Sequence, residues 1–191
     1  YTPLAAFLEG RLGRSVEIFY GRTLGEVRQS DEEAVDVIIG KACAVSFDAA
    51  EVNEPVRPMA RLTDSQGDPE VRGLFVVREK SPARTLGDLA DHRILFGPVR
   101  DDERHAQALA VLAENGVAPV PPLQIVADYA EALAMVAKGD ADVAVVPSYA
   151  QSLLDSLAGV EKGTLRVVGR TPGRPFVVAF ATSRVSPATE Q

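Results

Sequence analysis

The chain has 191 residues, of which 46% are hydrophobic and 25% are charged. These proportions exclude a disordered or collagen-like chain, and no apolar run reaches the roughly 18 residues that a membrane-spanning helix needs. The 27 acidic and 20 basic residues give a net charge of −7, which argues against nucleic acid as a partner because phosphate binding needs a basic face. One cysteine excludes an internal disulfide, and two histidines exclude a three-histidine zinc site.

The first half of the chain is predicted to alternate helices and strands. Thr2 as N-cap and Pro3 at the first helical position start a helix that ends at Gly13. Beyond it, short apolar and β-branched runs predict strands, and the longer segments between them predict helices. We expect strands at 16–20, 35–39, 56–62 and 73–78, and helices at 22–30 and 42–52.

The second half is predicted to follow the same order, with one additional strand at its start. A strand at 93–96 ends at Gly97, and a helix at 103–115 ends before Gly116. Further along, we expect strands at 123–126, 142–146, 165–169 and 176–181, and helices at 129–138 and 148–157.

The two halves match in order and spacing, which predicts two equivalent α/β lobes. The segments 34–39, 57–62 and 74–77 correspond to 140–145, 166–171 and 176–179. We therefore expect 73–78 and 176–181, each at the end of its repeat, to be the two strands that cross between the lobes, running side by side.

This repeat also predicts the domain boundaries. Lobe 1 is expected to span 1–79, with 182–191 returning to it, and lobe 2 to span 80–181. Because lobe 2 opens on a strand and lobe 1 opens on a helix, we expect the first strand of lobe 1 to lie upstream of Tyr1.

Four segments, 1–17, 35–40, 85–97 and 131–144, carry a family likeness. Together they resemble the phosphate/phosphite/phosphonate-type substrate-binding proteins of ABC transporters, and the likeness covers most of the chain. The resemblance implies an α/β, two-lobed type II periplasmic-binding-protein fold, with each lobe a mostly parallel sheet flanked by helices and the lobes joined by two crossover strands. It also implies a periplasmic protein, exported by a signal peptide that is not in this sequence.

The site is predicted in the cleft between the lobes, because ligands of such sheets bind outside the carboxyl ends of the strands. Several loops there run into helix N-termini, which favour an anion. At the turn 98–105 the chain departs from the family, since it has three carboxylates and no Ser or Thr where phosphonate binders have a Ser/Thr-rich turn; we identify a divergent member. The expected ligand contacts are Tyr20, Gly40, Lys41, Cys43, Val99, Arg100, His105, Asp128, Tyr129, Ser148 and Tyr149.

The leading hypothesis is a monomeric solute-binding protein that captures a small anionic ligand for an ABC permease or a sensor kinase. No P-loop, nucleophile elbow or zinc-protease motif appears, so we expect no enzyme activity, and also no cofactor or metal. Three alternatives stay open: a metalloid (arsenite-like) sensing protein, a LysR-type effector domain, and an accessory protein of a periplasmic redox enzyme. The first rests on Cys43, interpreted either as a cleft thiol of lowered pKa or as a small buried hydrophobe.

Overall fold

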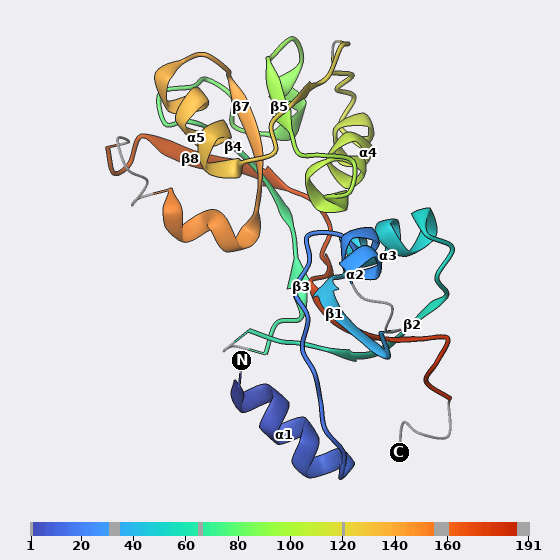
Figure 1. Ribbon diagram of the computed structural model, residues 1–191. Helices are drawn as coiled ribbons and strands as arrows, with labels where there is room; N and C mark the ends of the chain where they lie inside the picture. Colours follow the sequence, from blue (N-terminus) through green and yellow to red (C-terminus); the bar gives the residue numbers. More distant parts are fainter. Residues whose placement is uncertain (1, 31–34, 65–66, 120, 155–160, 187–191) are drawn as a thin grey trace.

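The computed structural model describes residues 2–30, 35–64, 67–119, 121–154 and 161–186 (Figure 1). The helices are labelled α, the 3₁₀ helices η and the strands β. In chain order they are α1 (Thr2–Leu12), α2 (Leu24–Ser30), β1 (Val37–Lys41), α3 (Ala42–Glu51), β2 (Val56–Arg61), β3 (Glu70–Val71), β4 (Gly73–Arg78), η1 (Leu86–Leu89), β5 (Ile94–Phe96), η2 (Asp102–Arg104), α4 (Ala106–Glu114), β6 (Gln124–Ile125), α5 (Tyr129–Lys138), β7 (Val143–Pro147), η3 (Ser148–Leu153), β8 (Leu165–Arg170), β9 (Arg174–Pro175) and β10 (Val177–Thr182).

Figure 1 shows two lobes, one above the other. The lower one, called lobe 1 below, contains a three-stranded sheet of order β1-β10-β2, with α2 and α3 beside it. The upper one, lobe 2, contains a five-stranded sheet of order β6-β5-β7-β4-β8, flanked by α4 and α5. The lobe 2 sheet is mixed: β6, β5 and β7 run parallel, whereas β4 runs antiparallel to both of its neighbours. In the lobe 1 sheet, β10 runs antiparallel to both β1 and β2.

The lobes are joined where β3 pairs with β9 in an antiparallel ladder. Just beyond it, the amide of Gly73 donates to Thr171 Oγ1 at 2.7 Å, and the amide of Thr171 donates to the Gly73 carbonyl at 2.8 Å. The prediction that 73–78 and 176–181 run side by side is therefore wrong. The crossing ladder precedes them, and each strand then continues into the sheet of the other lobe.

The internal repeat is confirmed by the strand order. The triplet β1-β10-β2 of lobe 1 corresponds to β7-β4-β8 of lobe 2, as the matched segments require. The central strand of each triplet comes from the opposite half of the chain. The lobe boundaries at 79/80 and 181/182 remain a prediction; this strand exchange favours placing the change of lobe at β3 and β9, and we propose that assignment.

The main core lies on the two faces of the lobe 2 sheet. Side chains alternate along a strand, so Leu74 and Val76 of β4 join the cluster under α5, and Phe75 and Val77 join the cluster under α4 and η1. All four are at most 1% exposed. Lobe 1 has a smaller core, built on Val45, Val178 and Phe180.

Local departures from the sequence prediction have identifiable causes. Residues 16–20 are extended but form no strand in the described part of the chain, because β-propensity needs a neighbouring strand to pair with. The helix expected at 103–115 is split into η2 and α4 by the non-helical backbone of His105. The helix expected at 148–157 is the 3₁₀ helix η3, and residues 155–160 lie outside the described residues.

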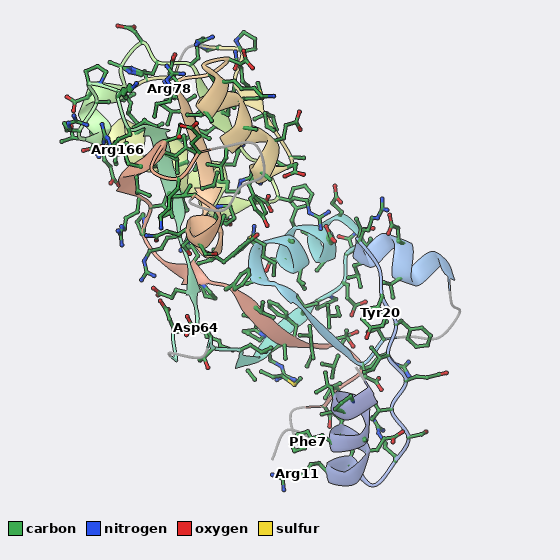
Figure 2. The ribbon with its side chains drawn as sticks, turned by 90° about the vertical axis from the view of Figure 1, so that its left-hand side faces the viewer. Phe7, Arg11, Tyr20, Asp64, Arg78 and Arg166 are labelled. Atoms are coloured by element: carbon green, nitrogen blue, oxygen red, sulfur yellow. The ribbon has the colours of Figure 1, made fainter. Side chains whose placement is uncertain are left out.

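Helix α1 lies apart from both sheets in Figures 1 and 2, joined to lobe 1 by the extended segment. The Arg11 guanidinium lies 5.7 Å from the centre of the Phe7 ring, and both residues are labelled in Figure 2. Among the described residues, every helix is too short or too polar to cross a lipid bilayer.

Candidate functional site

A lysine at the junction of β1 and α3 reaches from lobe 1 to lobe 2. Lys41 ends β1, with backbone angles that start the helix, but its side chain does not cap α3. Instead its Nζ donates to Asp101 Oδ1 at 2.8 Å and to Glu103 Oε1 at 2.7 Å, both in the turn before α4. Lys41 of lobe 1 thus forms ion pairs with two carboxylates of lobe 2, and these ion pairs connect the lobes.

These ion pairs are largely buried. The side chain of Glu103 is 1% exposed, and those of Lys41 and Asp101 are 18% and 20% exposed. Burial by itself lowers the pKa of Lys41, but the hydrogen bonds and negative charges of Asp101 and Glu103 outweigh it, so the pKa lies above the ordinary lysine value. Lys41 is therefore charged at neutral pH.

A second inter-lobe contact lies about two helical turns further along α3. Arg100, in the turn that follows β5, donates from Nη2 to Asp48 Oδ2 at 3.1 Å and to the carbonyl of Arg22 at 3.3 Å. Asp48 is buried in α3 and also accepts from the amide of Leu24 at 3.1 Å. Arg100 therefore ties the turn of lobe 2 to α3 and to the segment that precedes α2.

The turn itself is anchored in lobe 2 by Arg104, which is buried. Its guanidinium donates to three main-chain carbonyls, those of Val126, Ala127 and Val145, over 2.9–3.1 Å. It also pairs with Asp101 at 3.2 Å. Arg104 thus fixes the carboxylate of Asp101, which accepts a hydrogen bond from Lys41 of lobe 1.

Two glycines let the chain pack closely around this turn. A Cβ at Gly97 would stand 2.6 Å from Cβ of Arg104, and one at Gly73 would stand 2.1 Å from the carbonyl oxygen of Glu103. Any side chain at either position would displace the turn. The crossing strand and the site turn are therefore in direct contact.

A small pocket of about 160 Å³ opens beside the Lys41 bridge, at the N-terminus of α3. Arg174 of β9 donates from Nε to Asp102 Oδ2 at 3.2 Å across it. No side chain caps the N-terminus of α3, and its first amide, that of Ala42, donates to the carbonyl of Phe176 at 2.8 Å. The lining residues are Ala42, Cys43, Ser46, Asp102, Arg174 and Pro175.

Cys43 lines this pocket, but its thiol is not activated. Its Sγ lies 3.9 Å from Glu103 Oε2, and burial raises its pKa, although the Asp102 amide and Lys41 act in the opposite direction. The expectation of a lowered pKa at the helix start is therefore wrong, because desolvation outweighs the helix dipole and the nearby lysine.

An aromatic group borders the site on the lobe 2 side. The Tyr149 ring stacks on Phe176, next to β9, at 5.1 Å between centroids, and meets Tyr129 edge-on at 5.8 Å. Burial raises the pKa of Tyr149, which keeps its hydroxyl protonated. Tyr149 is still 47% exposed and offers an aromatic face to a ligand.

The other expected contacts have structural partners or lie at the surface. Ser148 Oγ accepts from the amide of Arg72 at the crossing, and Gly40 lies within β1 with no room for a side chain beside Val45. His105 Nδ1 bonds the Gly97 carbonyl at 2.8 Å, and Asp128 caps α5 by accepting from the amide of Ala130 at 2.7 Å.

Tyr20 and Val99 are 70% and 64% exposed. That any of the eleven expected residues contacts a ligand remains a prediction.

Sequence reasoning did not select the residues that organise the site: Asp101, Glu103, Arg104 and Arg174. Asp101 and Glu103 were counted only among the three carboxylates by which this turn departs from the Ser/Thr-rich turn of phosphonate binders. The available signal was a run of three carboxylates with Arg100 before it and Arg104 after it. Such a pattern can form ion pairs within the protein as well as repel an anionic ligand.

No group of three or more His, Cys, Asp or Glu side chains among the described residues is arranged to hold a metal ion. Cys43 and His105, considered together for a metalloid, have separate protein partners. Nothing at this site favours the metalloid alternative over a solute.

Solved structures with the same fold include several binding proteins. XAC2383 from Xanthomonas citri bound to chloride ion has a TM-score of 0.75 and 21% identity, covering 99% of this chain and 73% of that one. A binding protein component of an ABC phosphonate transporter from Pseudomonas aeruginosa has a TM-score of 0.68 and 16% identity, covering 97% of this chain and 64% of that one. PhnD1 from Prochlorococcus marinus in complex with methylphosphonate has a TM-score of 0.65 and 14% identity, covering 100% of this chain and 72% of that one.

The expected type II periplasmic-binding fold is thus confirmed. The comparison with curated proteins found no match. A family profile described as "ABC transporter, phosphonate, periplasmic substrate-binding protein" matches residues 1–191. With that match over its whole length, and with a two-lobed fold whose cleft is lined from both sides, the chain belongs to the periplasmic substrate-binding proteins of phosphonate-type ABC transporters.

Proposed function

We propose that the pocket beside α3 captures a small solute through an anionic group, and that an ABC permease reads the closed form of the two lobes. The observation that carries this proposal is the convergence of Arg174, Ser46 and the first turn of α3, which no side chain caps, on one small space. Each supplies N–H or O–H donors, and the arginine adds charge. The protein acts as a monomer in the periplasm and has no enzyme activity.

The ligand class is a phosphonate or sulfonate. Neighbouring structures include PhnD1 in complex with methylphosphonate and an aliphatic sulphonate binding protein from Escherichia coli. Both names describe an organic group with a compact oxyanion head, which suits a pocket of about 160 Å³ better than a large anion does.

A zwitterion is the second candidate, because Asp102 lies in the same pocket as Arg174. An amine of the ligand would pair with Asp102 while its acid group takes Arg174. Two arginine-binding proteins share the fold, with TM-scores of 0.53 and 0.55.

Thermal unfolding with methylphosphonate, an alkylsulfonate and L-arginine tests both candidates. A probe at about 100 times its dissociation constant adds about 2.7 kcal/mol of stability. Arg174→Gln should abolish the shift, because it removes the charged donor of the pocket. The variant should still fold, because the Arg174 side chain is half-exposed and the backbone pairing of β9 with β3 does not depend on it. Arg61→Gln, at an exposed position of β2, is the matched control and should keep it.

Mass spectrometry of solutes released from natively purified protein completes the test. A released phosphonate, sulfonate or amino acid would support the proposal. No released solute, together with no thermal shift, would contradict capture in this pocket. A shift that Arg174→Gln leaves intact would place the ligand elsewhere.

A further inference from the structure

A larger pocket, of about 370 Å³, lies at the outer end of lobe 2. Strand β4 begins at the crossing with Gly73 and ends at Arg78, so this pocket lies a full strand length away from the inter-lobe cleft. In Figure 2 Arg78 and Arg166 mark this end of the molecule, opposite α1. The lining residues are Arg78, Lys80, Ser81, Pro82, His92 and Asp142.

The carboxylate in this pocket is already neutralised. Asp142 Oδ2 accepts from the Arg93 amide and Nε, each at 3.0 Å, and Oδ1 accepts from Arg93 Nη2, also at 3.0 Å. These bonds lower the pKa of Asp142 and keep it ionised. Its charge and its acceptor positions are therefore directed at Arg93 rather than at the pocket.

Arg78 is held in place with one nitrogen left for a ligand. Its Nη1 donates to the carbonyls of Val136 at 3.0 Å and Ala141 at 3.4 Å. Gly139, with φ of 92°, lies so close that an added Cβ would stand 3.0 Å from the same nitrogen. Nη2 lies 3.9 Å from Asp142 Oδ1, beyond hydrogen-bond range, so its N–H groups remain available in a fixed direction.

The loop after β4 supplies further donors. Within the described part of the chain, Lys80 has no hydrogen bond or ion pair, and its side chain is exposed. Ser81 Oγ accepts from the Ala83 amide at 3.3 Å, which leaves its own proton to donate. Arg166 donates from Nη2 to the Ser81 carbonyl at 2.9 Å and so fixes the loop.

Charge and geometry together define the ligand. Arg78 and Lys80 line the pocket with a single carboxylate, Asp142, whose charge is matched by Arg93, so the pocket carries excess positive charge on a chain whose net charge is −7. We propose that this outer pocket binds a small divalent oxyanion, such as sulfate or phosphate, with Arg78 and Lys80 as charged donors and Ser81 as a neutral donor. The site is independent of the inter-lobe cleft.

A titration of the full chain with sodium sulfate, followed by backbone-amide NMR at constant ionic strength, tests the proposal. Saturable shifts are expected at the amides of residues 80, 81, 92 and 93. Lys80→Gln should weaken the affinity about three- to fivefold, the usual range for one exposed charge pair. Arg61→Gln removes an exposed cation from lobe 1 and should leave the affinity unchanged.

Shifts that grow linearly without saturating would overturn the proposal, as would equal affinity in Lys80→Gln and Arg61→Gln. Because the amides near Arg174 report separately on the cleft, failure at the outer pocket is distinguishable from failure of solute capture.

Discussion

Replacing Lys41 by methionine tests whether the inter-lobe ion pair stabilises the molecule. Methionine keeps much of the apolar stem of lysine but removes the charge. In the described part of the chain, Lys41 is the only ion-pair partner of Glu103, whose side chain is 1% exposed. The substitution therefore leaves a buried carboxylate without a counter-charge.

Breaking a buried pair in this way costs about 3–5 kcal/mol, and we expect about 2–3 kcal/mol here because Lys41 and Asp101 retain some contact with water. Glu103→Gln should cost less, about 1 kcal/mol, since Lys41 keeps Asp101 and an amide oxygen replaces the carboxylate oxygen as acceptor. The double variant buries no unpaired charge at position 103. It should therefore be more stable than Lys41→Met alone.

Urea unfolding of the four proteins at neutral pH gives the coupling energy, and a fluorescence distance between the lobes shows whether they separate before they unfold. Single effects that add to within about 0.5 kcal/mol, with an unchanged inter-lobe distance, would refute the reasoning.

The sign of the pH dependence gives a second check. Because the folded-state pKa of Lys41 is raised above 10.5, its contribution is fully present below the unfolded-state pKa and is lost as pH rises through the folded-state pKa. As pH is raised from neutral, the difference between wild type and Lys41→Met should therefore persist until the pH passes the folded-state pKa of Lys41.

Three further outcomes follow from the described contacts. Cys43 should react with iodoacetamide more slowly than a thiol in the urea-unfolded chain, because burial raises its pKa; equal rates would contradict this. Asp142→Asn should destabilise the protein at neutral pH, and its urea midpoint should converge with wild type as pH falls below 3.8 through the lowered folded-state pKa of Asp142. Asp128→Ala should cost about 1 kcal/mol in thermal melts, because it removes the N-cap of α5; an unchanged melt would show that the cap adds nothing.

Local sequence patterns predicted most of the elements, because apolar runs and caps act over short distances. The strand 73–78 and the helix 129–138 were expected with the bounds that the structure shows. The segment 16–20 has the composition of a strand, but no strand pairs with it among the described residues. Strand formation depends on such a neighbour, and the composition of the segment does not reveal it.

The ion pairs of the site depend on packing between lobes and could not be predicted in the same way. Lys41 meets Asp101 and Glu103 across about 60 residues of sequence, through a lobe arrangement that no local pattern encodes. A run of three carboxylates is usually solvated, so a buried Glu103 was not expected. It is tolerated because lobe 1 supplies the cation.

The exchange of β4 and β10 between the lobes has a consequence for synthesis of the chain. Strands β1 and β2 of lobe 1 do not pair with each other, and the strand that joins them, β10, spans Val177–Thr182, near the end of the sequence. The lobe 1 sheet therefore cannot close before the chain has been synthesised as far as β10. Every strand of the lobe 2 sheet precedes β10, so a nascent chain can complete the later lobe before the earlier one.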